Sequence, residues 1–309
     1  TIGQGGFQEM EQMRLFADCV CYQEEVRDPS RIPEVLNRVI MQAWRNSAPA
    51  QMNIPRDFWT QVIDVDLPQV VAFERPAGGE RAVGEAAALL SAARFPVILS
   101  GAGVVLSGAI PDLVRLAERL DAPVCSNYQH NDSFPGSHPL AMGPLGYNGS
   151  KAGMEIIARA DVVLALGTRL NPFSTLPGYG IDYWPKDAKI IQVDINADRI
   201  GLTKKVTVGI QGDAGKVARG ILAQLADDAG DAGRQERRDL VAQTKSRWAQ
   251  ELSSLDHEDD DPGTEWNAGA RRRDADLMSP RQAWRAIMQA MPQDAIVSSD
   301  IGNNCAIGN

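Results

Sequence analysis

Residues 96–126 read PVILSGAGVVLSGAIPDLVRLAERLDAPVCS, and this stretch decides the fold. Its first four residues are apolar and Ser100 follows them, which is typical of a strand buried on both faces. A glycine turn follows, then apolar residues at helical spacing over 110–120, and residues 123–126 begin a second strand. The order strand, helix, strand indicates a parallel βαβ unit.

The same alternation continues along the chain. Further helices are expected over 154–160 and 216–225, and further strands over 162–166, 189–195 and 206–210. Near-continuous apolar strands between helices indicate a parallel sheet covered on both faces. We therefore expect an α/β fold in which residues 85–226 form a complete, Rossmann-like central domain.

The residues before this domain repeat the pattern once. Asp28-Pro29 starts a helix with apolar residues spaced from Ile32 to Ala43, and short β-like runs lie at 19–23 and 51–54. Residues 1–68 therefore read as a second parallel βαβ unit. Residues 69–84, which are rich in Pro and Gly, read as a linker.

The residues after the central domain change in composition. Asp, Gly, Arg and Glu dominate residues 227–278, which we interpret as a charged linker with one long helix over 235–252. Ser279-Pro280 then starts a helix through Met291, and a strand is expected over 295–299. Because both ends of the sequence resemble the interior of an α/β unit, we expect an internal piece of a longer protein.

Composition excludes several classes of function. The formal charge of -9 and the pI of about 5.0 argue against nucleic acid as a partner, because phosphate backbones require clustered Lys and Arg. No apolar run reaches the roughly 18 residues of a membrane span. Cys19, Cys21, Cys125 and Cys305 lack metal-binding spacing. We expect buried free thiols and a reducing cytoplasm.

Two features of the central domain are compatible with a nucleotide. The turn Gly101-Ala102-Gly103 follows a strand and could present backbone amides to a phosphate, or could be an ordinary tight turn between strand and helix. Asp194 ends a strand and could accept a ribose hydroxyl or cap a helix. The sequence leaves both pairs of alternatives open.

Four other polar residues also stand where they could bind a ligand. Asp213 follows Gly212, as in a GDG metal motif, but Ala214 replaces the second glycine, so we expect Asp213 to cap the next helix. His130 and His138 lie in a loop after a strand, where they could act on a ligand or simply be solvated. Arg169 follows another strand and could bind an anion or pack against a neighbouring loop.

Six long strings resemble the thiamine-diphosphate enzymes of the acetolactate synthase and pyruvate oxidase superfamily. They are TIGQGGFQE from Thr1, CYQEEVRDPSR from Cys21, SAPAQMNIPRDFWTQVIDV from Ser47, SNYQHNDSFPGSHPLAMGPLGYNGSKA from Ser126, LGTRLNPF from Leu166 and SSDIGNNCAIGN from Ser298. The resemblance implies three parts: the end of a pyrimidine-binding domain in 1–68, the central domain in 85–226, and the truncated start of a diphosphate-binding domain in 279–309.

The resemblance also implies an activity. The sequence is similar to members of this superfamily that convert sulfoacetaldehyde and phosphate to acetyl phosphate and sulfite. They do so through an acetyl group bound to thiamine diphosphate, in the breakdown of taurine and other sulfonates. Mg²⁺ and a homodimer or homotetramer are implied as well. Since the reaction has no redox step, we expect no required flavin. The alternatives are an acetolactate synthase-like carboligase acting on pyruvate, and a non-catalytic nucleotide-binding homologue.

The site residues that the resemblance implies lie near the two ends of the sequence. Phe7 and Gln8 match a pair that lines the active site, and Ile301, Gly302, Asn303 and Asn304 match the turn that approaches the cofactor diphosphate. Arg169 is a candidate for binding the substrate anion. The family's activating glutamate is expected upstream of Thr1 and its metal motif downstream of Asn309. No catalytic or metal-ligating residue is therefore expected here, and the 309 residues alone should be inactive.

Overall fold

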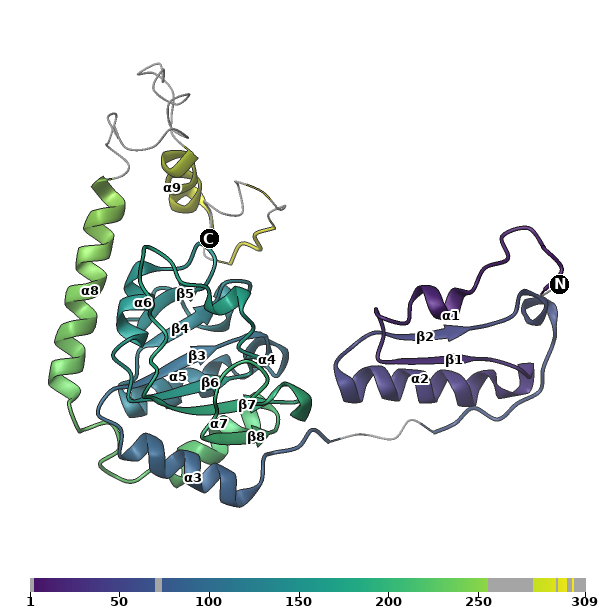
Figure 1. Ribbon diagram of the computed structural model, residues 1–309, viewed down its shortest axis with the longest axis horizontal. Helices are drawn as coiled ribbons and strands as arrows, with labels where there is room; N and C mark the ends of the chain where they lie inside the picture. Colours follow the sequence, from purple (N-terminus) through teal and green to yellow (C-terminus); the bar gives the residue numbers. More distant parts are fainter. Residues whose placement is uncertain (1–2, 70–73, 255–279, 293, 299–301, 303–309) are drawn as a thin grey trace, which may run out of the picture. The chain divides into compact units, whose positions relative to one another are not determined.

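The chain forms two compact units, Thr1–Glu74 and Arg75–Asn309. The structure is a computed structural model, and it describes residues 3–69, 74–254, 280–292, 294–298 and 302 (Figure 1). None of the described helices is long and apolar enough to cross a membrane.

The first unit is a parallel βαβ unit, as predicted. Its elements are α1 (Gln12–Leu15), β1 (Tyr22–Glu25), α2 (Ile32–Asn46) and β2 (Ala50–Asn53). The strands pair in parallel, with Tyr22 opposite Ala50. The Asp28 carboxylate accepts from the amide of Ser30 at 2.9 Å and starts a 3₁₀ turn that continues into α2.

One side of this small sheet is apolar. Val26, Val35 and Val39 are buried together, and apolar residues of both strands pack against them. The strand expected at 19–23 lies instead at Tyr22–Glu25, because Cys19 belongs to the turn after α1, where its amide bonds to the carbonyl of Phe16 at 2.9 Å.

The expectation of buried thiols is confirmed at one cysteine and wrong at two. Cys125 is buried within the second unit, and burial raises the pKa of its thiol to about 12. Cys19 and Cys21 are exposed. Both were expected within a strand, but β1 begins at Tyr22, after both of them. Cys305 lies outside the described residues.

The second unit contains a six-stranded, wholly parallel sheet in the order β5-β4-β3-β6-β7-β8. The strands are β3 (Pro96–Ser100), β4 (Val124–Asn127), β5 (Ala141–Leu145), β6 (Val162–Leu166), β7 (Lys189–Asp194) and β8 (Val208–Gln211). The helices are α3 (Glu80–Ser91), α4 (Ala102–Leu106), α5 (Ile110–Leu120), α6 (Lys151–Ile157), α7 (Ala214–Gln224), α8 (Arg234–Ser254) and α9 (Pro280–Ala290).

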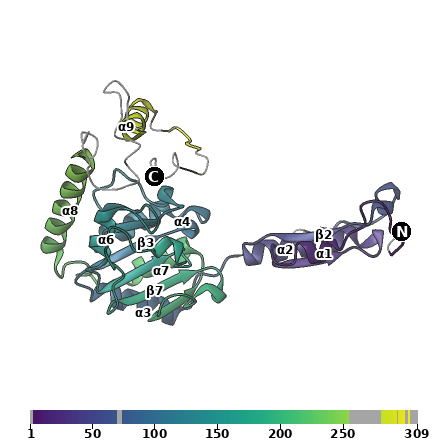
Figure 2. The same cartoon turned by 45° about the horizontal axis from the view of Figure 1, so that its top comes forward.

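Helices cover both faces of this sheet, as the apolar strands predicted (Figure 2). Helices α3, α5 and α7 contribute to one buried apolar cluster and α6 and α8 to the other. Every residue of β3 and β6 is buried. The sheet is therefore the rigid platform on which the loops at its carboxyl edge are built.

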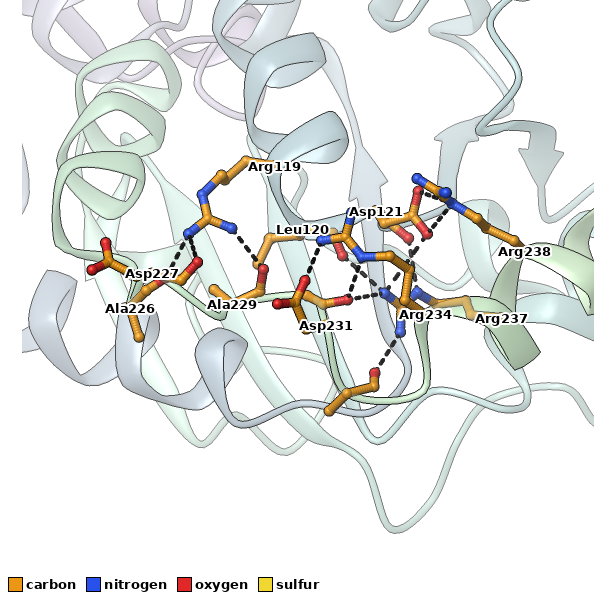
Figure 3. Close-up of polar contacts among 12 residues, drawn as sticks. Arg119, Leu120, Asp121, Ala226, Asp227, Ala229, Asp231, Arg234, Arg237 and Arg238 are labelled. Atoms are coloured by element: carbon orange, nitrogen blue, oxygen red, sulfur yellow. Dashed lines mark hydrogen bonds and ion pairs between the residues drawn. The ribbon is translucent and has the colours of Figure 1, made fainter.

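Helix α8 is attached through a buried arginine. The guanidinium of Arg237, 1% exposed, donates to the main-chain carbonyls of Asp121, Arg94, Ala232, Leu120 and Gly230 over 2.6 to 3.1 Å (Figure 3). Two of these carbonyls belong to the end of α5, where a helix leaves acceptors without intrahelical partners.

Three parts of the second unit differ from expectation. Strand β5 was not predicted, because Gly143 and Pro144 interrupt its apolar pattern, although proline is tolerated in an edge strand. Helix α3 begins at Glu80, within the range assigned to the linker. Residues 295–298 form no strand, and Ile296 is 99% exposed, because no described strand pairs with them; Ser299 lies outside the described residues.

Candidate functional site

The predicted pair Phe7 and Gln8 lies in a closed glycine loop of the first unit. The Glu9 carboxylate accepts from the amides of Gly3 and Gly6, the second at 3.1 Å, and these bonds lower the pKa of Glu9. Gly3 has φ 79° and Gln8 has φ 64°, both in the left-handed region. The loop presents Phe7 outward, with 95% of its surface exposed.

Of the second predicted set, the structure describes Gly302 alone. Gly302 has φ 127°, and no atom of the described residues lies within 4 Å of the place where a Cβ would be. A side chain there would be strained, so glycine suits this position and leaves its backbone open to a close approach. Ile301, Asn303 and Asn304 lie outside the described residues.

The turn after β3 is a packing turn. The amide of Gly101 bonds to the carbonyl of Leu166 at 3.1 Å, and that of Gly103 to the carbonyl of Gly167 at 2.9 Å. A Cβ on Gly103 would lie 2.6 Å from the Cα of Gly167. These two amides already have backbone partners, so the geometry favours the tight-turn alternative over a phosphate cradle.

Asp194 closes a local turn, and Asp213 caps a helix. Asp194 is 5% exposed and its Oδ1 accepts from the amide of Asn196 at 2.9 Å, while burial raises the pKa of its carboxyl. Asp213 accepts from the amides of Gly215 and Lys216 at 3.1 and 3.2 Å, so its prediction as the cap of α7 is confirmed.

The two loop histidines are in local contacts. His130 Nδ1 lies 3.6 Å from the carboxylate of Asp132. His138 Nε2 lies 3.3 Å from Glu118, and its ring meets that of Phe134 edge-on at 5.0 Å. These contacts support structural roles for both histidines.

Arg169 is exposed at the carboxyl edge of the sheet. It makes no hydrogen bond or ion pair with the part of the chain that the structure describes. Its charge acts on Asp194, as one of the lesser influences that lower the pKa of that carboxyl against the larger effect of burial. The guanidinium is therefore free to meet an anion from solvent.

Sequence reasoning missed an aromatic cluster at the same edge. The rings of Tyr147 and Phe173 stack at 5.3 Å, and Tyr128 meets each of them edge-on at 5.6 Å. Beside it, Asn127 donates to Thr168 Oγ1 at 2.8 Å, and its Oδ1 is buried without a described partner. The three rings come from separate loops, so no local sequence pattern predicted that they would meet.

A cavity of about 640 Å³ beside the edge strand β5 was also missed. Tyr179, Lys245, Trp248 and Arg281 line it, among smaller residues. Lys245 Nζ donates to the carbonyls of His138 and Pro139 at 3.3 and 3.0 Å, and burial lowers the pKa of its ammonium. The cavity therefore combines two cations with two aromatic side chains.

Comparison with known proteins decides the family. Residues 83–221 match the family model described as "Thiamine pyrophosphate enzyme, central domain". A relative from Rhizobium meliloti (strain 1021), named "Probable sulfoacetaldehyde acetyltransferase", is 75% identical over 309 residues, which is 100% of this chain and 52% of the relative. The chain belongs to the thiamine pyrophosphate enzymes. It spans about half the length of the curated relatives it matches.

One further relative agrees with this family, and one solved structure agrees with the fold. A "Sulfoacetaldehyde acetyltransferase" from Roseovarius nubinhibens is 74% identical over 309 residues, which is 100% of this chain and 51% of that protein. The crystal structure of benzoylformate decarboxylase from Polynucleobacter necessarius matches with a TM-score of 0.65 at 21% identity, covering 90% of this chain and 46% of that one. The second likeness supports the fold.

Membership of the thiamine pyrophosphate enzymes implies thiamine diphosphate as cofactor. Gly302 fits a place beside a diphosphate, because its backbone is open and lacks a side chain. Among the described residues, no group of three or more His, Cys, Asp or Glu could hold a metal ion. The two sets of predicted site residues lie in different units.

Proposed function

We propose that the protein containing this chain converts sulfoacetaldehyde and phosphate to acetyl phosphate and sulfite, with thiamine diphosphate as cofactor. The observation that carries this proposal is the identity of 74 to 75% to two relatives with that named activity, along the whole chain rather than in the central domain alone. Both units therefore take part in the likeness.

Bound thiamine diphosphate supplies a carbon nucleophile and an electron sink for this class of reaction. The residues of this chain then have binding and orienting roles. Ile301, Gly302, Asn303 and Asn304 would hold the diphosphate, since a glycine allows close approach and amide side chains donate hydrogen bonds without adding negative charge. Mg²⁺, which prefers oxygen ligands, would complete that site.

Phe7 and Gln8 would line the pocket for the substrate. The exposed ring of Phe7 offers an apolar surface that excludes water, and the amide of Gln8 can donate and accept hydrogen bonds. Arg169 remains the candidate for the substrate anion, because its planar guanidinium has no partner among the described residues.

The setting of the reaction belongs to the same proposal. We expect a homodimer or homotetramer in the cytoplasm, acting in the breakdown of taurine and related sulfonates. Cys125 is a buried free thiol, in keeping with a reducing compartment.

The test uses the protein expressed from its complete coding sequence. It is supplied with thiamine diphosphate, Mg²⁺ and sulfoacetaldehyde, and sulfite is followed with and without phosphate. Phosphate-dependent sulfite is the expected result. Release of carbon dioxide from pyruvate, without sulfite from sulfoacetaldehyde, would instead identify a carboligase. Release of neither sulfite nor carbon dioxide would indicate a non-catalytic homologue.

A further inference from the structure

The second face of the β1–β2 sheet is polar. Side chains alternate along each strand, so Gln23 and Glu25 of β1 and Gln51 and Asn53 of β2 lie opposite the face that packs on α2. Parallel sheets usually carry apolar side chains on both faces. Amides on this face therefore require an explanation other than core packing.

These amides form a directional chain. Gln23 Nε2 donates to Gln51 Oε1 at 2.6 Å, and Gln51 Nε2 donates to Asn53 Oδ1 at 2.8 Å. Asn53 Nδ2 then donates to Gln12 Oε1 at 3.2 Å. Gln51 and Asn53 each both accept and donate through their amides, so the bonds reinforce one another.

The chain of amides closes on helix α1. Gln23 Nε2 also donates to the carbonyl of Met13 at 2.6 Å, and Met13 follows Gln12 in the sequence. We call the closed set of Gln12, Gln23, Gln51 and Asn53, with the Met13 carbonyl, the amide ring. It attaches α1, a helix of four residues without buried side chains, to both strands.

Helix α1 is the end point of the loop that carries Phe7 and Gln8. The amide of Gln12 bonds to the carbonyl of Met10 at 2.9 Å, and Glu9 closes the loop through the amides of Gly3 and Gly6. Glu9 therefore fixes the shape of the loop, while the amide ring is what joins it to the sheet.

We propose that the amide ring positions Phe7 and Gln8 for catalysis, with Gln23 and Asn53 as positioning residues. This rests on the proposed function, which places Phe7 and Gln8 at the active site. The amide ring holds α1 by one hydrogen bond to its main chain, from Gln23, and one to its side chain Gln12, from Asn53. Removal of one amide takes a hydrogen-bond partner from the adjacent amides of the ring. Small displacements of groups at a reacting centre are costly, about a hundredfold in rate for 1 Å.

The test compares Asn53→Ala with Asn46→Ala in the protein made from its complete coding sequence. Asn46 is a matched control because it is also half-buried in the first unit, and its Nδ2 donates to the carbonyl and to the Oε1 of Gln42, at 2.8 and 3.4 Å. Gln23→Met is a second variant that removes the donor to Met13. Amide hydrogen exchange over residues 3–13, the thermal midpoint, kcat and KM are measured for each.

We expect faster exchange over residues 3–13 and a fall of about tenfold to a hundredfold in kcat/KM in Asn53→Ala and Gln23→Met, with the Asn46→Ala values unchanged. Exchange equal to that of Asn46→Ala would overturn the inference, as would faster exchange with unaltered kcat/KM. If the parent releases no sulfite, the proposed function fails. The kinetic comparison then uses whichever of sulfoacetaldehyde and pyruvate the protein consumes, and if it consumes neither, the positioning inference falls too.

Discussion

At the scale of single residues, glycines join the two turns at the centre of the large sheet. Gly103 follows β3 and Gly167 follows β6, and the position of a Cβ on Gly103 is 2.6 Å from the Cα of Gly167. The obstructing atoms belong to the main chain, so the obstacle cannot rotate away. Close backbone approach, rather than phosphate binding, accounts for the glycine pattern that the sequence displays here.

The variant Gly103→Ala should therefore destabilise the protein by about 1 to 3 kcal/mol, since a methyl group in this contact forces the backbone to shift. The gain in helix propensity within α4, at most about 1 kcal/mol, does not offset this. Urea unfolding measures the difference. Gly136→Ala is the control, because within the part of the chain that the structure describes no atom comes within 4 Å of the Cβ position there. Equal unfolding free energies for the two variants would contradict the packing argument.

Asp194 predicts a dependence of stability on pH. Burial raises the pKa of its carboxyl above the usual 3.8, so the charged form costs free energy in the folded state. Asp194→Asn removes the charge and keeps an oxygen for the amide of Asn196. The variant should be more stable than the parent at pH 7 to 8.

This advantage should shrink as the pH falls through the raised pKa, since Asp194 then takes up a proton while folded. It should vanish below 3.8, where the group is neutral in both folded and unfolded chains. Urea midpoints from pH 8 downward give the comparison. A variant less stable than the parent at pH 7 would show that the charge of Asp194 is favourable.

At the scale of secondary structure elements, α8 is attached through few buried side chains, of which Arg237 makes the most hydrogen bonds. It is polar over most of its surface, and Arg237, Val241 and Thr244 are its buried residues. Arg237 supplies five bonds to carbonyls, while Arg238 binds the Asp121 carboxylate at 2.9 Å (Figure 3). The planar guanidinium suits several acceptors at once.

Replacing this arginine, as Arg237→Met, should lower the free energy of unfolding by roughly 3 kcal/mol or more, because buried carbonyls lose their donors. Arg81→Met provides the control, since Arg81 is 86% exposed and makes one ion pair of 3.3 Å, worth at most about 1 kcal/mol. Denaturant titration measures the free energy of unfolding of both variants. Similar losses in the two would mean that apolar packing, not hydrogen bonding, holds α8.

The elements also show what a sequence can predict. The strands 96–100 and 162–166 and the helix 110–120 were predicted to the residue, because their patterns are local. Strand β5 was missed because its glycine and proline hide an edge strand that its neighbour stabilises. The strand predicted over 295–299 was wrong over 295–298. Its apolar residues fit a strand, but no described strand pairs with them.

The candidate site follows the same rule. The Asp213 cap was predictable, because its partners are two and three residues away. The amide ring was not, because it joins residues near positions 12, 23, 51 and 53 that meet after folding. The roles of Phe7, Gln8 and Arg169 stay predictions until tested.

At the scale of the whole molecule, the sequence places the predicted site residues near positions 7 and 302 outside the central domain. The family model matches residues 83–221, whereas the predicted site residues near positions 7 and 302 lie on either side of that match. The central domain contains a parallel sheet with a buried apolar cluster on each face. The chemistry is expected from the residues that flank it.

The measurement that tests this account most directly is the stoichiometry of products from sulfoacetaldehyde. The protein made from its complete coding sequence is incubated with thiamine diphosphate, Mg²⁺ and phosphate, and sulfite and acetyl phosphate are determined in the same samples. We expect equal amounts of sulfite and acetyl phosphate, both dependent on phosphate. Absence of sulfite, with release of carbon dioxide from pyruvate, would contradict the proposed reaction and leave the family assignment and the fold in place.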